Sequence, residues 1–244
     1  MKREFYKMTA DEFAEVVPKR INSCILPVGT MEAHGVIPIG TDVIIPEKFA
    51  QILAERLNLL IAPPIYYGIT RSLIAHPGSM TVTPATFEKY TYEVMLALIN
   101  VGFHNIVILN GHGGHFDELK RNAYKLYEEK KARTITIHWW ILCQDVTERL
   151  YGKRGGHAAI DETAAILATE PATVQKSHYR PEQAYLDKAG LMPHPHPTRI
   201  VVYEPGSPDL DFNEDKAKDY FAACTTKIGD EITRIFRLWQ TAGV

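Results

Sequence analysis

The stretch "NIVILNGHGGH", residues 105–115, decides the fold class. It begins with a short run of β-branched and apolar side chains, Asn105–Leu109, and a glycine-rich segment follows directly. Such a run bounded by glycine is typical of a buried strand in a parallel sheet. The glycines remove side chains around His112, so that its backbone can approach a neighbouring group closely. The stretch therefore predicts an α/β fold with a functional loop at the carboxyl end of a strand.

The rest of the chain alternates short apolar runs with longer amphipathic segments, as in a parallel sheet flanked by helices. Further strands are predicted at Cys24–Val28, Leu59–Ala62, Thr134–His138 and Arg199–Tyr203. Helices are predicted from the capping box at Thr9–Glu12, from Pro46 to Leu57 and Pro84 to Val101 with both prolines in first turns, from Asp117 to Ala132 and from Asn213 to Trp239. Residues Tyr179–Pro197 are expected to form a long loop. These elements fit one domain over residues 1–244.

The composition is that of an ordinary globular protein and argues against several classes of function. The 27 Lys and Arg residues nearly balance the 29 Asp and Glu residues, so we expect neither a nucleic-acid partner nor a membrane partner. No apolar run approaches the ~20 residues of a membrane span, and the N-terminal residues lack the apolar core of a signal peptide. Cys24, Cys143 and Cys224 are far apart and outside any C-x-x-C pair. Reduced buried thiols and a cytoplasmic location are therefore expected.

Three polar clusters are candidates for a functional site. They are "EAHG…TD" with Glu32, His34 and Asp42, "NGHGGH" with His112 and His115, and "GGHAAIDET" with His157 and Glu162. The first two clusters directly follow predicted strands, at the edge of the sheet where α/β proteins bind ligands. Glu32 and His34 alternate along an extended loop, so their side chains point the same way. Mixed imidazole and carboxylate ligands without clustered cysteines favour a catalytic Zn, Mn or Fe(II) site.

The charges of these residues suit two divalent cations. Glu32, Asp42 and Glu162 supply three negative charges, and one hydroxide supplies the fourth. With His34 and His112 as neutral ligands, the sequence predicts a two-metal centre that activates water as a nucleophile. The alternative is that the same side chains only cap loops and turns. Neither a G-x-S-x-G elbow nor a P-loop is present to supply a different chemistry.

The segments "LPVGTMEAHGVIPIGTD" (26–42), "NGHGGH" (110–115) and "HAAIDET" (157–163) resemble signature regions of the creatininase (creatinine amidohydrolase) family. The resemblance implies a three-layer α/β/α sandwich with a mainly parallel sheet. It also implies two divalent metal ions per subunit (Zn, Mn or Fe) and a homo-oligomer, commonly a hexamer.

The resemblance also assigns roles to individual residues. Glu32 and His112 would hold one metal, His34 would hold the other, and Asp42 would bridge them. His157 would be the acid–base residue beside the metal-bound water.

The sequence departs from the creatininase pattern in the second signature region. Gly113 and Gly114 stand where creatininase has an aromatic residue and a metal-binding glutamate. Glu162 is expected to replace the missing ligand and to take part in catalysis. The segment "AHPGSM", residues 75–80, resembles a family loop that lies over the active site. The substrate contacts expected from these comparisons are His76, Ser79, Gly113 and His115.

The predicted activity is hydrolysis of a small cyclic amide, in which a metal-bound hydroxide attacks the carbonyl; the departures argue against creatinine itself. A second hypothesis is cleavage of a carbon–carbon bond in a cyclic diketone from inositol breakdown, as by a 3-dehydro-scyllo-inosose hydrolase. A hypothesis of another class is a non-catalytic metal- or ligand-binding protein.

Of Trp139 and Trp140, one is expected in the core and the other in the wall of the substrate cavity. His194 and His196 are assigned to a plain loop.

Overall fold

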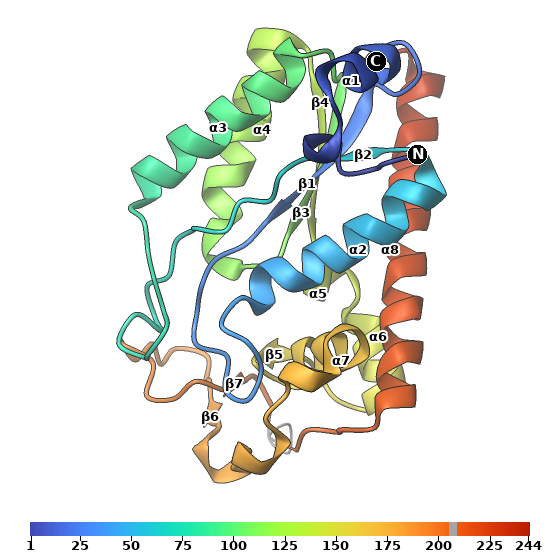
Figure 1. The fold of residues 1–244 in the computed structure, drawn as a ribbon. Helices are drawn as coiled ribbons and strands as arrows, with labels where there is room; N and C mark the ends of the chain where they lie inside the picture. The colour runs from blue at the N-terminus through green and yellow to red at the C-terminus, as the bar shows by residue number, and fades with distance from the viewer. Residues whose placement is uncertain (205–208) are drawn as a thin grey trace.

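A parallel sheet between two layers of helices forms the centre of the molecule (Figure 1). The structure is a computed structural model that describes residues 1–204 and 209–244. The strands are β1 (Ser23–Val28), β2 (Leu60–Ile61), β3 (Asn105–Asn110) and β4 (Arg133–His138), in the order β2-β1-β3-β4. Every neighbouring pair is parallel, and Val28 of β1 is paired with Asn110 of β3. The loops that leave these two strands therefore begin side by side.

Alternate side chains of the strands pack against different helix layers. Leu26 and Ile108 belong to the core under α3 (Pro84–Asn100) and α4 (Phe116–Lys130), the green helices of Figure 1. Ile25 and Val107 belong to the core on the other face. That face is covered by α2 (Thr41–Leu57), α7 (Ile160–Thr169) and α8 (Glu214–Ala242). The predicted three-layer α/β/α arrangement with a parallel sheet is confirmed.

Several local predictions are confirmed as well. Thr9 forms a capping box with Glu12 at the start of α1 (Ala10–Val16), and Pro84 is in the first turn of α3. The predicted helices before Ala132 and after Asn213 are α4 and α8. All three cysteines are buried and free. Among the described residues, none of the helices is both long and apolar enough to span a membrane.

A smaller sheet lies beyond the carboxyl ends of the main strands. It contains β5 (Gly156–His157), β7 (Val201–Val202) and β6 (Tyr185–Leu186), in that order. The predicted strand Arg199–Tyr203 is therefore real only in its centre and belongs to this sheet, where it pairs antiparallel with β5. The predicted loop 179–197 contains β6, which pairs parallel with β7. In the described part of the chain, the remaining elements are α5 (Trp139–Leu142), α6 (Gln144–Tyr151) and five short 3-10 helices at Phe5–Lys7, Gly113–His115, Pro171–Thr173, Lys176–His178 and Pro181–Gln183.

The prediction that Pro46 lies in the first turn of its helix is wrong, because α2 already begins at Thr41. Asp42 is consequently a first-turn residue of the helix. Pro46 has no backbone N–H, so the carbonyl of Asp42 loses its usual helical partner. Gly29 and Gly111, which follow β1 and β3, lie against this carbonyl, and a Cβ on them would come within 2.2 Å and 1.9 Å of its oxygen. This close packing fixes the start of α2 over the two strand ends.

We predict that Gly111→Ala destabilises the protein by about 1 to 3 kcal/mol, because the added methyl group forces the start of α2 away from the sheet. The melting temperature should fall by roughly 2–4 °C for each kcal/mol. Gly113→Ala is the matched control, since a Cβ there meets nothing closer than 3.9 Å. Equal melting temperatures for the two variants would show that the contact with Asp42 does not constrain the fold.

Candidate metal centre

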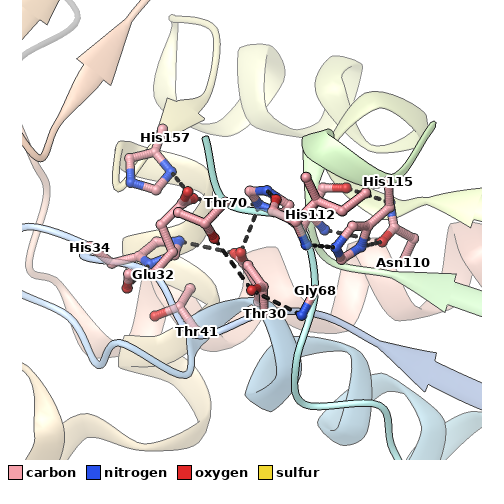
Figure 2. Close-up of polar contacts among 12 residues, drawn as sticks. Thr30, Glu32, His34, Thr41, Gly68, Thr70, Asn110, His112, His115 and His157 are labelled. Atoms are coloured by element: carbon pink, nitrogen blue, oxygen red, sulfur yellow. Dashed lines mark hydrogen bonds and ion pairs between the residues drawn. The ribbon is translucent and has the colours of Figure 1, made fainter. Parts of the chain in front are cut away.

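The residues predicted to bind metal come together at the carboxyl ends of β1 and β3 (Figure 2). Glu32 and His34 lie on the loop after β1, Asp42 in the first turn of α2, and His112 on the loop after β3. Glu162, in the first turn of α7, completes the group. Four of these side chains are almost fully buried and His112 is partly buried. Charged and polar groups so deep in a protein need partners among themselves or a bound ion.

The ligand atoms form two groups of three that share Asp42. Its Oδ2 lies 2.9 Å from His112 Nδ1, and Glu32 Oε2 lies 3.4 Å from the same nitrogen. Its Oδ1 lies 2.9 Å from His34 Nε2, and Glu162 Oε2 lies 3.6 Å from that nitrogen. Within each group, the potential ligand atoms are all within 4.8 Å of one another. The two oxygens of one carboxylate therefore face two different ligand groups, as a bridging ligand requires.

The orientation of the three imidazoles is set by backbone carbonyls. His34 Nδ1, His112 Nε2 and His157 Nε2 each lie 2.8 Å from a carbonyl oxygen, of Glu32, Ile69 and Ala33 respectively. A carbonyl oxygen only accepts, so each of these nitrogens carries a proton and donates it. The other nitrogen of each ring faces the carboxylates. This arrangement, in which one nitrogen donates to a fixed acceptor, is typical of metal-binding histidines.

Two buried atoms at the shared position support a metal. Neither His34 Nε2 nor Asp42 Oδ2 has a partner with hydrogen-bond geometry among the described residues. Both are nevertheless 2.9 Å from a potential ligand atom of another residue. Close approach without hydrogen-bond geometry suits atoms that coordinate a common cation. The mixed oxygen and nitrogen donors fit two divalent ions, one in each group.

Without metal, the same geometry keeps protons on the imidazoles. Burial opposes a charge on His34, but Asp42 and Glu162 outweigh it and raise the pKa to about 10. Burial is likewise outweighed at His112, where Glu32 and Asp42 raise the pKa to about 9. At Asp42 the two charged imidazoles overcome burial and lower the pKa. Burial raises the pKa of both Glu32 and Glu162.

His157 lies beside this centre without belonging to the groups that contain Asp42. Its Nδ1 is 3.5 Å from Glu32 Oε2, and its ring lies 4.2 Å from the ring of His34, measured between centroids. Burial and the nearby charge of His34 hold its pKa well below the usual range. The next residue, Ala158, has a left-handed φ of 52° and donates its N–H to Glu162 Oε2 at 2.6 Å. One tight turn therefore places both His157 and Glu162.

His115 does not line the cavity, contrary to the prediction of a substrate contact. Its side chain is fully buried behind His112, where Nδ1 donates to Asn110 Oδ1 at 3.0 Å and Nε2 accepts from the N–H of Ile69 at 3.1 Å. The carbonyl of Ile69 in turn accepts from His112. A side chain at Gly68 would collide with the His115 ring (Figure 2). His115 thus positions the backbone segment that orients His112.

His76 and Ser79, which were also expected to contact substrate, are not among the residues that line the cavity. Ser79 Oγ accepts the N–H of Ala33 at 3.0 Å and supports the loop between Glu32 and His34. His76 Nε2 donates to the carbonyl of His196 at 2.9 Å. Both side chains hold neighbouring loops in place. Of the four expected contacts, only Gly113 lines the cavity.

A cavity of about 510 Å³ opens above the metal ligands. Trp140 forms part of its wall while Trp139 is only 1% exposed, so one tryptophan is in the core and the other in the cavity, as predicted. His196, which was assigned to a plain loop, lines the cavity as well. Sequence reasoning missed several further lining residues, among them Gln144, Arg154, Asp187 and Tyr203. They follow no strand of the main sheet and carry no motif, so nothing in the sequence marked them.

The sequence profile of the creatininase (creatinine amidohydrolase) family matches residues 6–230. The chain belongs to the creatininase family. The 3-dehydro-scyllo-inosose hydrolase of Thermotoga maritima is 28% identical over 78% of this chain and 66% of its own length. The creatinine amidohydrolase of Pseudomonas putida is 26% identical over 62% of this chain and 65% of its own length.

A further relative is the mycofactocin precursor peptide peptidase of Mycolicibacterium smegmatis, which is 27% identical over 62% of this chain and 59% of its own length. The matched part of the chain thus spans less than two thirds of the length of each of these curated relatives.

Solved structures agree on the fold. A point mutant of creatininase superposes with a TM-score of 0.82 at 20% identity, over 97% of this chain and 99% of its own. A manganese form of creatininase gives 0.74 at 21% identity over 97% and 99%.

We predict that loading the metal-free protein with zinc at about pH 7.5 releases at least about two protons per chain. His34 and His112 have pKa values of about 10 and about 9, so both are protonated at that pH and must lose a proton to bind metal. Apparent affinity should rise with pH until these protons are gone. Calorimetric titration in buffers of different ionisation enthalpy counts the protons; a release near zero would mean that the imidazoles are neutral without metal.

Replacing Glu162 tests the proposed ligand set. We expect Glu162→Gln to lower the metal content from about two ions to about one, since an amide is a poor ligand for a divalent cation. The amide oxygen can still accept the N–H of Ala158, so the fold should survive. Glu118→Gln, at a glutamate of similar burial in α4, is the control. If elemental analysis finds equal metal in wild type and Glu162→Gln, Glu162 is not a ligand.

Proposed function

We propose that this protein is a metal-dependent hydrolase that opens a small cyclic amide. The observation that carries the proposal is the pair of ligand groups sharing Asp42 at the floor of a cavity. A volume of about 510 Å³ suits a small molecule. Membership of the creatininase family supports hydrolysis as the reaction class.

Each group of ligands would hold one divalent cation. Glu32, Asp42 and His112 would hold the first, and His34, Asp42 and Glu162 the second. When bound, such ions polarise a substrate carbonyl and lower the pKa of water. The overall reaction adds water across the C–N bond, so the carbonyl carbon gains a hydroxyl group and the nitrogen gains a hydrogen.

His157 is the residue placed to move a proton in this reaction. Its Nε2–H is fixed by the carbonyl of Ala33, which leaves the lone pair of Nδ1 on the side of Glu32. Because Nδ1 is unprotonated in this tautomer, it would first accept a proton from the attacking water. The same Nδ1 then delivers the proton to the leaving nitrogen.

Metal content and turnover together test the proposal. Protein purified without chelator should carry about two transition-metal ions per chain and should open lactams such as 2-pyrrolidinone or dihydrouracil. His157→Ala should keep its metal but lose about 10²- to 10⁴-fold in kcat. His178→Ala, at an exposed histidine far from the motifs, should match the wild type. Folded protein that neither carries nor binds metal would overturn the hydrolase and favour a non-catalytic ligand-binding protein.

A second candidate is hydrolysis of a cyclic diketone. It is favoured by the similarity to 3-dehydro-scyllo-inosose hydrolase, which covers 78% of this chain. The same ligand groups would serve a reaction that breaks a carbon–carbon bond. Turnover of 1,3-cyclohexanedione alongside the lactams separates the two, because each reaction demands a different leaving group.

A further inference from the structure

One positively charged side chain faces the cavity above the proposed metal centre. Among the described residues that line the cavity, Arg154 is the only Lys or Arg. It precedes His157 by three residues and lies in the segment that leads into β5. A group bound to its guanidinium would therefore be attached to a molecule that also reaches the proposed proton-transfer residue.

The position of Arg154 is set by a chain of hydrogen bonds. Its backbone N–H donates to Glu204 Oε1 at 2.6 Å, and its Nη2 donates to Gln144 Oε1 at 3.1 Å. Gln144 in turn donates its amide Nε2 to Glu148 Oε1 at 2.8 Å. The amide oxygen of Gln144 is thus the atom that faces Arg154. The guanidinium is therefore held at the cavity by a neutral acceptor.

The guanidinium of Arg154 has unused donors. Other arginines are paired with carboxylates, namely Arg3, Arg56, Arg121 and Arg234. In residues 1–204 and 209–244, no carboxylate oxygen lies within 4.0 Å of a guanidinium nitrogen of Arg154, although Glu204 accepts its backbone N–H. A guanidinium has five N–H donors in a planar fork, of which Gln144 takes one. The remaining edge can bind a planar anion in a bidentate manner.

Three of the four acidic side chains that line the cavity have partners of their own. Glu32 and Glu162 face the imidazoles, and Asp161 Oδ1 accepts the N–H of Gly156 at 3.0 Å. Asp187 lies on the segment after β6, where its charge acts on His196. These negative charges disfavour a dianionic group such as phosphate in the same cavity. A single planar carboxylate is the anion that best fits Arg154.

We propose that Arg154 binds a carboxylate of the substrate, so that the substrate is a small cyclic amide that carries a carboxylate. This inference rests on the proposed hydrolase function. The amide carbonyl would lie at the metal ligands, and the carboxylate would lie against the guanidinium at the wall. Arg154 is then a residue that determines specificity and takes no part in bond cleavage.

Matched substrates test the proposal. The metal-loaded protein is assayed with 5-oxoproline against 2-pyrrolidinone and with dihydroorotate against dihydrouracil, since each pair differs only by the carboxylate. We expect kcat/KM to be about tenfold or more higher for the carboxylated member. Arg154→Met should remove this preference through KM, with a much larger loss of kcat/KM for the carboxylated than for the neutral member of each pair, and Arg154→Lys should restore only part of it. Arg149→Met, at an exposed arginine of α6, the helix that carries Gln144, is the control.

The outcomes separate this inference from the proposed function. A preference that survives in Arg154→Met, or equal turnover of both members of each pair by the wild type, overturns the carboxylate site. If no cyclic amide is opened, the proposed function fails, and the site is then tested by calorimetric binding of 5-oxoproline to the metal-loaded protein. Binding that is about tenfold weaker in Arg154→Met than in wild type and Arg149→Met supports the site. Equal affinity in all three proteins overturns it.

Discussion

The site depends on a single carboxylate that faces two groups of ligands. Asp42 can do this because the first turn of α2 lies directly over the ends of β1 and β3. The helix can come this close to the strand ends only where the residues after the strands lack side chains, as Gly29 and Gly111 do. Pro46 removes the N–H that would otherwise bond the Asp42 carbonyl within the helix. The start of a helix also favours the negative charge that Asp42 would need in order to hold the proposed cations.

Around this carboxylate, the backbone controls the imidazoles. The clearest case is the segment at Ile69, whose N–H is held by His115 and whose carbonyl orients His112. Thr30 strengthens the same segment by accepting the N–H of Gly68 at 3.2 Å (Figure 2). Because the acceptor of each of these hydrogen bonds is a backbone carbonyl, replacing the side chain of the acceptor residue does not remove it. Ring orientation is therefore built into the fold, whichever metal is bound.

The fold and the floor of the site could be predicted from the sequence because both depend on local patterns. Strand β3 followed by glycines, and the alternation of Glu32 with His34, place polar groups at the carboxyl edge of a parallel sheet. Contacts between distant segments were beyond such reasoning. His115 has the same neighbours in sequence whether it faces the cavity or the interior, and only the approach of Gly68 decides between them. The predicted start of α2 was wrong because Pro46 is tolerated inside the helix. The carbonyl four residues before it, that of Asp42, packs against glycine instead of accepting a helical hydrogen bond.

Floor and walls of the cavity come from different parts of the fold, and this division bears on how substrate is selected. The floor is carried by the main sheet, α2 and the β5–α7 turn, which hold the ligand atoms rigidly. The walls come from α5, α6 and the segments around β6 and β7, which contribute Trp140, Gln144, Asp187 and Tyr203. A floor of this kind serves any reaction that begins with water adding to a carbonyl. Family membership alone therefore does not determine which bond is cleaved. Discrimination must come from groups that touch the rest of the substrate. Because a fixed charge such as that of Arg154 disfavours ligands that leave it unpaired, we expect the walls rather than the proposed metal ligands to select the substrate.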